Sequence, residues 1–130
     1  MTIAVDTVAT DADIESEVAG TSALRDLLPE GWTTAKPARE IALTETLREL
    51  SRRTPPILEA DLIEVTDLRD SVIYGALARL YRAAIQVDGD RYWHLARHYE
   101  KAYANERRTV RPTLQDGQSA HPHTITMHRR

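Results

Sequence analysis

The stretch from Asp70 to Ala84 constrains the fold of this chain more than any other feature, because its apolar residues recur at helical spacing. Asp70 can cap such a helix, and Gly75 in its middle would cost about 1 kcal/mol relative to alanine. That cost points to a close contact at Gly75 or to no special role. The expected buried stripe of this helix consists of Val72, Ile73, Ala76, Leu77, Leu80 and Ala84.

Three further segments have helical character. The first is Ala38–Arg53, which Thr54-Pro55-Pro56 ends, the second is the shorter Leu58–Val65, and the last is Ala96–Arg108. The chain of 130 residues contains no Phe, so Leu, Ile, Val and Ala must fill the core. A small apolar stripe cannot be buried by one helix alone, and this predicts that the helices pack around one another.

The dipeptide Asp88-Gly89 lies between two short β-prone runs, Ile85–Val87 and Arg91–Leu95. Asp-Gly between such runs is the strongest short signal for a β-hairpin. The sequence therefore predicts a two-stranded hairpin after the helix 70–84. Helices and hairpin together are expected to bury eight large side chains: Leu47, Leu50, Leu62, Leu68, Val72, Leu77, Leu80 and Trp93.

The order of three helices followed by a Gly-tipped hairpin resembles the winged helix-turn-helix family over residues 38–95. Leu68 occupies the motif turn, and the helix after it has the form Ser-x-x-Tyr-x-x-Leu-x-x-Leu, from Ser71 to Leu80. The wing would be Ile85–Leu95. The resemblance implies a mostly α fold with a small β-hairpin, made of three helices plus the wing and followed by a C-terminal helix over residues 96–111.

In this family the second motif helix lies in the major groove of DNA. The resemblance therefore implies a sequence-specific regulator of transcription that binds double-stranded DNA with the helix 70–84 as its recognition helix. Ser71 and Tyr74 would reach base edges, whereas Arg79 and Arg82 would hold phosphates. The expected DNA-binding residues are Arg69, Ser71, Tyr74, Arg79, Arg82 and Arg91.

Two acidic residues at the predicted wing tip favour a different function. Asp88 and Asp90 would repel the phosphate backbone. The alternative is a winged-helix module for protein–protein interaction that does not bind DNA strongly and has a protein as its partner. A homodimer through residues 96–108 is a further expectation, because that helix carries an apolar strip made of Tyr99, Ala102 and Tyr103.

The last helix also carries five basic residues: Arg97, Lys101, Arg107, Arg108 and Arg111. They could follow phosphates, but Glu100 and Glu106 favour the interpretation of a surface helix with ion pairs. His94 and His98 have no carboxylate or Cys arranged around them, so we expect no metal site. No nucleophile elbow, Gly-rich phosphate loop or paired Asp and His motif indicates catalysis, and we expect neither an enzyme nor a cofactor.

The two ends of the chain differ in composition from its middle. Residues 1–30 hold seven acids and one base, which predicts an acidic, partly disordered head and linker over residues 1–37, with a short helix at Ser22–Leu28. Residues 112–130 show no sustained periodicity, and we expect them to be disordered. The chain lacks Cys, a secretory signal and an apolar run of about 18 residues. We therefore expect a cytoplasmic protein that is not bound to a membrane.

Overall fold

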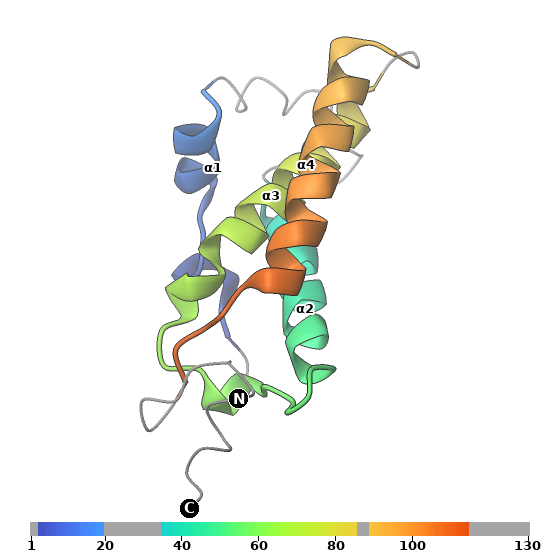
Figure 1. Ribbon diagram of the computed structural model, residues 1–130. Coiled ribbons are helices and arrows are strands. Elements are labelled where there is room, and N and C mark those ends of the chain that lie inside the picture. Colours follow the sequence, from blue (N-terminus) through green and yellow to red (C-terminus); the bar gives the residue numbers. More distant parts are fainter. Residues whose placement is uncertain (1–2, 20–34, 86–88, 115–130) are drawn as a thin grey trace, which may run out of the picture.

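The computed structural model describes residues 3–19, 35–85 and 89–114, which contain four α-helices and three short 3-10 turns (Figure 1). Within these residues there is no strand, and one isolated antiparallel bridge joins Leu62 to Leu114. The predicted mostly α class is confirmed, whereas the hairpin and the winged-helix arrangement are not found in these ranges. The helices are α1 (Asp11–Glu17), α2 (Lys36–Ser51), α3 (Arg69–Ala84) and α4 (Arg91–Thr109).

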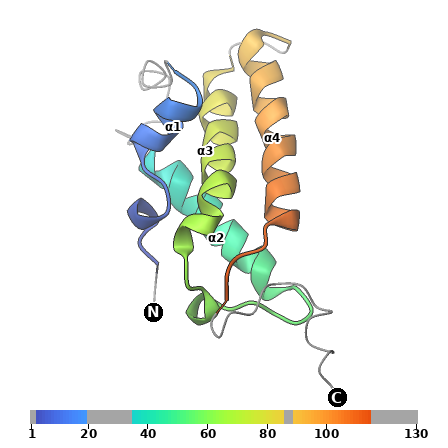
Figure 2. The same cartoon turned by 60° about the vertical axis from the view of Figure 1, so that its left-hand side comes forward.

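Helix α3 is the central element of the fold. It packs against α1, α2 and α4, and Figures 1 and 2 both place it between α1 and α4. Ten of its sixteen residues are buried, including every residue of the predicted stripe. The helix predicted over residues 70–84 is therefore confirmed, but most of its residues face the interior of the molecule and only a minority reach solvent.

The core of the protein is built mainly from Ala, Val, Leu and Ile, with Tyr81 and Tyr103 as its buried aromatic residues. Of the eight side chains expected to be buried, five are buried and three are half-buried. The half-buried ones are Leu47, Leu62 and Trp93. Gly75 lies where α2, α3 and α4 meet, because a Cβ atom there would lie 2.6 Å from Ala42 Cβ and 2.8 Å from Tyr103 Cε1. The close contact that this glycine suggested is real.

The second strand predicted for the wing is wrong, because its residues are helical. Arg91–Leu95 forms the first turns of α4, and Gly89, with a φ of 88°, makes the turn that leads into this helix. Asp90 caps α4, because its carboxylate accepts a hydrogen bond of 2.8 Å from the Trp93 amide. The Asp-Gly pair therefore belongs to a connection between two helices. Gln86–Asp88, with most of the predicted first strand, lie outside the described residues.

The predicted helix Leu58–Val65 is also wrong. The segment contains only two 3-10 turns, Glu59–Asp61 and Val65–Leu68, with extended backbone at Leu62 and Glu64. Its hydrogen bonds are long-range, since the Ile63 amide donates to the Thr113 carbonyl at 3.1 Å. The Thr113 amide in turn donates to the Asp67 carboxylate at 2.8 Å. A helix of about two turns is marginal by itself, and the hydrogen bonds with Thr113 form in its place.

Part of the acidic head has regular structure that the sequence analysis did not predict. Residues 3–19 form a 3-10 turn, Val5–Thr7, and then α1, and they bury Val5, Val8 and Ile14. Arg39 of α2, 4% exposed, holds the segment through Asp6 at 2.7 Å, Asp11 at 2.9 Å and the Ala9 carbonyl at 2.8 Å. The helix expected at Ser22–Leu28 and most of the tail, 115–130, lie outside the described residues.

Candidate nucleic-acid interface

Helix α4 has two faces of different chemistry. Its inner face packs against α3, where the Tyr81 ring stacks with Tyr92 and Tyr99 at centroid distances of 6.2 and 5.9 Å. Its outer face carries exposed residues at intervals of three and four, the spacing of one side of a helix. The members of this outer face are His94, Arg97, His98, Lys101, Asn105 and Arg108.

The two acidic residues inside α4 do not belong to this outer face. Glu100 forms an ion pair with Arg82 of α3. Glu106 is half-buried, and its pKa is raised by burial and by the nearby Asp70 carboxylate of α3. Both acids therefore sit on the α3 side of the helix, and the outer face is free of carboxylates over its length.

The contacts made by the outer cations leave their positive charge uncompensated. The Arg97 guanidinium lies 5.0 Å from the centre of the Trp93 ring, and Arg108 donates to the Asn105 side-chain oxygen at 3.0 Å. An indole ring and an amide carry no net charge. Among the described residues, no ion pair involves Arg97, Lys101 or Arg108. The outer face therefore presents three positive charges over about 16 Å of helix.

The carboxyl end of α4 adds a further cation. Arg53 donates to the carbonyl oxygens of Val110 at 2.6 Å, Arg107 at 3.2 Å and Arg108 at 3.0 Å, which stabilises the negative end of the helix dipole. Burial lowers the pKa of the Arg53 guanidinium, Glu49 raises it, and the positive charge of Arg111 lowers it again. Arg53 and Arg108 thus both lie at the carboxyl end of α4.

Helix α3 turns several predicted contact residues inward. Ser71 is fully buried and shares a hydrogen bond of 2.7 Å with Thr46 of α2, so its hydroxyl does not face solvent. The Tyr74 ring is half-buried beside Tyr99, with 6.1 Å between the ring centres. Neither side chain lies on an open face where a base edge could approach it.

The predicted arginines are dispersed rather than gathered. Arg79 pairs with Glu45 of α2 at 3.0 Å, and Arg82 pairs with Glu100. Arg91 is exposed at the start of α4 and lies over the Tyr92 ring at 4.8 Å, whereas Arg69 is exposed at the other end of α3. The structure does not bring the six predicted residues together on one surface.

The apolar strip expected to form a dimer is already covered within the chain. Tyr103 is buried, and its hydroxyl donates to the Ala42 carbonyl at 3.0 Å and to the Glu45 carboxylate at 2.7 Å. Tyr99 and Ala102 are half-buried. The inner face of α4 therefore packs within one molecule and is not open to a second copy.

The outer face of α4 is the surface that sequence reasoning missed. Its cations were visible, but they appeared mixed with Glu100 and Glu106 in the linear sequence. Helical spacing places Arg97, Lys101 and Arg108 on one side and both glutamates away from them, and the start of α4 at Arg91 adds His94 to the same side. The separation of the basic residues from both glutamates could have been predicted by placing the expected helix 96–108 on a wheel of 3.6 residues per turn.

The described part of the chain shows no other candidate centre of comparable clarity. No group of three His, Cys, Asp or Glu within it could hold a metal ion, and no helix in these ranges combines the length and apolar character needed to cross a bilayer. Comparisons with protein-family models, with curated proteins and with solved structures return no match to this chain. The interpretation of its function therefore rests on the geometry of α4.

Proposed function

We propose that this protein binds double-stranded DNA through the outer face of α4, with phosphates as its main contacts. The observation that carries the proposal is the row of Arg97, Lys101 and Arg108 on a face without carboxylates. The helix 70–84, which the family resemblance favoured, is less suited to this role because most of it is buried.

The dimensions and charge of α4 fit this role. A helix of 19 residues is about 28 Å long, and a major groove of about 12 Å width admits an α-helix. Arginine and lysine that neutralise phosphates supply most of the affinity for DNA, and each releases bound counterions. With about three to five such contacts, we expect modest affinity, strong dependence on salt and little preference among sequences. Asn105 is the side chain of this face best suited to read a base edge.

Charge reversal tests the proposal. We expect K101E and the double variant R97E/K101E to weaken binding to a duplex of about 30 base pairs, and to make the dependence of log K on log salt shallower by about one for each phosphate that is no longer neutralised. Fluorescence anisotropy between about 50 and 200 mM salt measures both quantities. Unchanged melting temperatures would show that the variants remain folded.

R69E is the matched control, because it makes the same change of charge at an exposed arginine of α3. We expect it to bind DNA nearly as well as the unaltered protein. If R69E loses affinity while K101E does not, α3 carries the interface and the proposal is wrong. If the unaltered protein does not bind the duplex even at low salt, a protein partner replaces DNA as the ligand of the basic face.

A further inference from the structure

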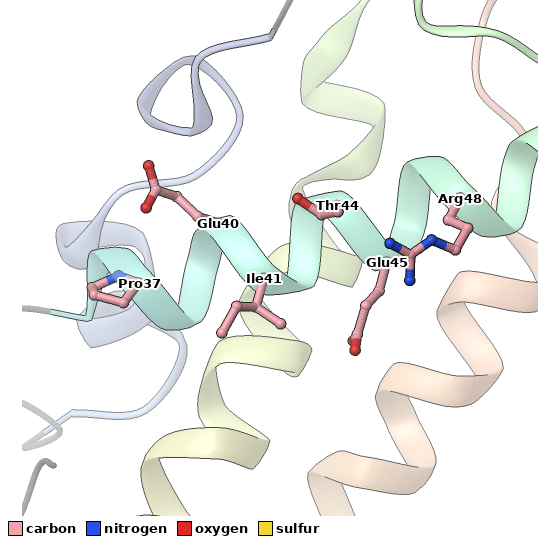
Figure 3. A pocket seen from close by; sticks show the side chains of 6 residues that line it. All are labelled: Pro37, Glu40, Ile41, Thr44, Glu45 and Arg48. Atoms are coloured by element: carbon pink, nitrogen blue, oxygen red, sulfur yellow. The ribbon is translucent and has the colours of Figure 1, made fainter.

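Helix α2 exposes apolar side chains on the side that faces away from the core. Figure 3 shows this outer face, where Pro37, Glu40, Ile41, Thr44, Glu45 and Arg48 project from the helix. Ile41 is 37% exposed, although the opposite side of the same helix is buried through Ala38, Ala42 and Leu50. A helix with apolar residues on both sides has a second surface to cover.

Two hollows meet on this outer face. One, of about 420 Å³, is lined by residues of α2 from Pro37 to Arg48. The other, of about 440 Å³, extends past Leu47 and Ser51 to Leu58, which is 56% exposed. Both hollows include Thr44 and Arg48. These adjoining hollows form a groove along α2, whose lining mixes the apolar Ile41, Leu47 and Leu58 with the charged Glu40, Glu45 and Arg48.

Two pairs of residues in this groove lie symmetrically about Thr44. Glu40 and Arg48 lie four residues to either side of it, and Ile41 and Leu47 lie three residues to either side. When two copies of a helix pack antiparallel across a two-fold axis at one residue, positions equally far before and after that residue face each other. Glu40 of each copy would then face Arg48 of the other, and Ile41 would face Leu47.

We propose that the outer face of α2 binds a second copy of this chain, forming a two-fold symmetric dimer centred on Thr44. The opposite charges at Glu40 and Arg48 select this antiparallel partner, because a parallel alignment would place like charges together. Both side chains belong to exposed residues, and no ion pair among the described residues engages either of them. The small Thr44 at the axis lets the helices approach closely, and Ile41, Leu47 and Leu58 supply the apolar area.

The proposal is independent of DNA binding, since the groove on α2 and the basic face of α4 share no residue. It also differs from the dimer that the sequence suggested through residues 96–108. That strip packs against α3, whereas the groove on α2 is open.

Complementary charge reversals test the dimer. E40R gives a groove with two arginines and R48E a groove with two glutamates, so each variant alone sets like charges against each other. We expect each to weaken self-association by at least about tenfold. An equimolar mixture of E40R and R48E restores opposite charges across the axis, and we expect it to form a mixed dimer. Sedimentation velocity distinguishes the 14.7 kDa chain from a species of twice that mass.

The double variant E40R/R48E is a second test of the charge pairing. It exchanges the two charges, so it should self-associate like the unaltered chain. R69E should leave the dimer intact because Arg69 does not line the groove, and so should R97E/K101E. Far-ultraviolet circular dichroism should show the same helix content in all of them. A monomeric unaltered chain, or a mixture of E40R and R48E that stays monomeric, would overturn the proposal.

Discussion

At the scale of single residues, Gly75 and Tyr103 determine how closely the three long helices approach. The Tyr103 ring rests against Gly75 of α3, and its hydroxyl reaches the Ala42 carbonyl and the Glu45 carboxylate of α2. The guanidinium of Arg107 covers the same ring at 4.3 Å. One side chain of α4 thereby connects to both other long helices.

We expect G75A to destabilise the protein, although alanine is the better helix former by about 1 kcal/mol. The added methyl group would lie within 2.9 Å of Ala42 Cβ and the Tyr103 ring, and overpacking of this kind costs about 1 to 3 kcal/mol. Overpacking should outweigh the gain in helix propensity, and a net decrease in stability of up to about 2 kcal/mol should appear in urea denaturation. A104G, at an exposed position of α4, measures helix propensity alone. A G75A protein as stable as the unaltered one would contradict the close approach of the three helices.

Tyr103 should also make the protein sensitive to alkali. Burial and the hydrogen bond to Glu45 raise the pKa of Tyr103 from 10.0 to about 12. Between these values the folded state keeps a proton that the unfolded chain has released, so the free energy of unfolding should fall by about 2 to 3 kcal/mol as the pH rises from 10 to 12. Y103F should flatten this decline in urea denaturation at about pH 8 and about pH 11. Equal slopes for both proteins would rule out the assignment to Tyr103.

At the scale of elements, the start of α4 separates what local sequence can predict from what packing decides. The buried stripe of α3 could be predicted because the residues at helical spacing in the sequence are the ones that the fold buries. Asp88-Gly89 correctly marks a turn, but Tyr92 prefers to stack on Tyr81, which extends α4 back to Arg91. Likewise, apolar residues at helical spacing in Leu58–Val65 do not reveal that the Ile63 amide bonds to Thr113.

Helix α1 has a start signal in the sequence that its acidic surroundings conceal. Thr10 and Asp13 form a capping box, with the Asp13 amide donating to the Thr10 hydroxyl and the Thr10 amide donating to the Asp13 carboxylate. This pattern of Thr followed three residues later by an acid marks a helix start. The acidic composition alone predicts disorder for the head, whereas the capping box correctly indicates a helix at Asp11–Glu17.

The cap of α4 can be tested directly. D90A removes the acceptor of the Trp93 amide and should cost about 1 kcal/mol, whereas D90N, which retains a capping oxygen, should cost less. Hydrogen exchange should show faster opening of the first turn of α4 in D90A. Equal destabilisation by both variants would mean that capping by Asp90 contributes little.

At the scale of the whole molecule, charge is divided between opposite sides. Residues 3–19 contain five acids and no base, and both views place α3 between α1 and the basic helix α4. Such a separation orients a molecule in the field of a polyanion. If the outer face of α4 meets DNA, the acidic segment points away from it.

Arg39 fixes that acidic segment to the rest of the protein. R39A and R39K should both release residues 3–19, since the guanidinium bonds two carboxylates and a carbonyl in a geometry that an ammonium cannot match. Limited proteolysis should then cleave the segment faster. K36A is the control, because Lys36 is exposed and lies 3.7 Å from Asp6. Cleavage of R39A at the rate of K36A would contradict this role.

Acid should have the same effect as R39A. The hydrogen bond from Arg39 holds the pKa of Asp6 below 3.8, so the stabilising contribution is present above that pH and is lost as the pH falls further. Hydrogen exchange of the Val5, Val8 and Ile14 amides should accelerate below about pH 4 before the long helices open. Simultaneous opening of all elements would argue against a separate role for this ion pair.

The bonds between the segment after Ser51 and the residues after α4 have a consequence for how the protein is made. Arg53 binds the Val110 carbonyl across 57 positions of sequence, and Leu62 pairs with Leu114. A ribosome delivers the chain from its N-terminus, so the segment 53–67 emerges long before its partners do. Until Val110–Leu114 leave the exit tunnel, the nascent helices can pack against α3. The segment 53–67 cannot yet form its hydrogen bonds with the residues that follow α4. Completion of the fold is thus timed by the last described residues to be synthesised.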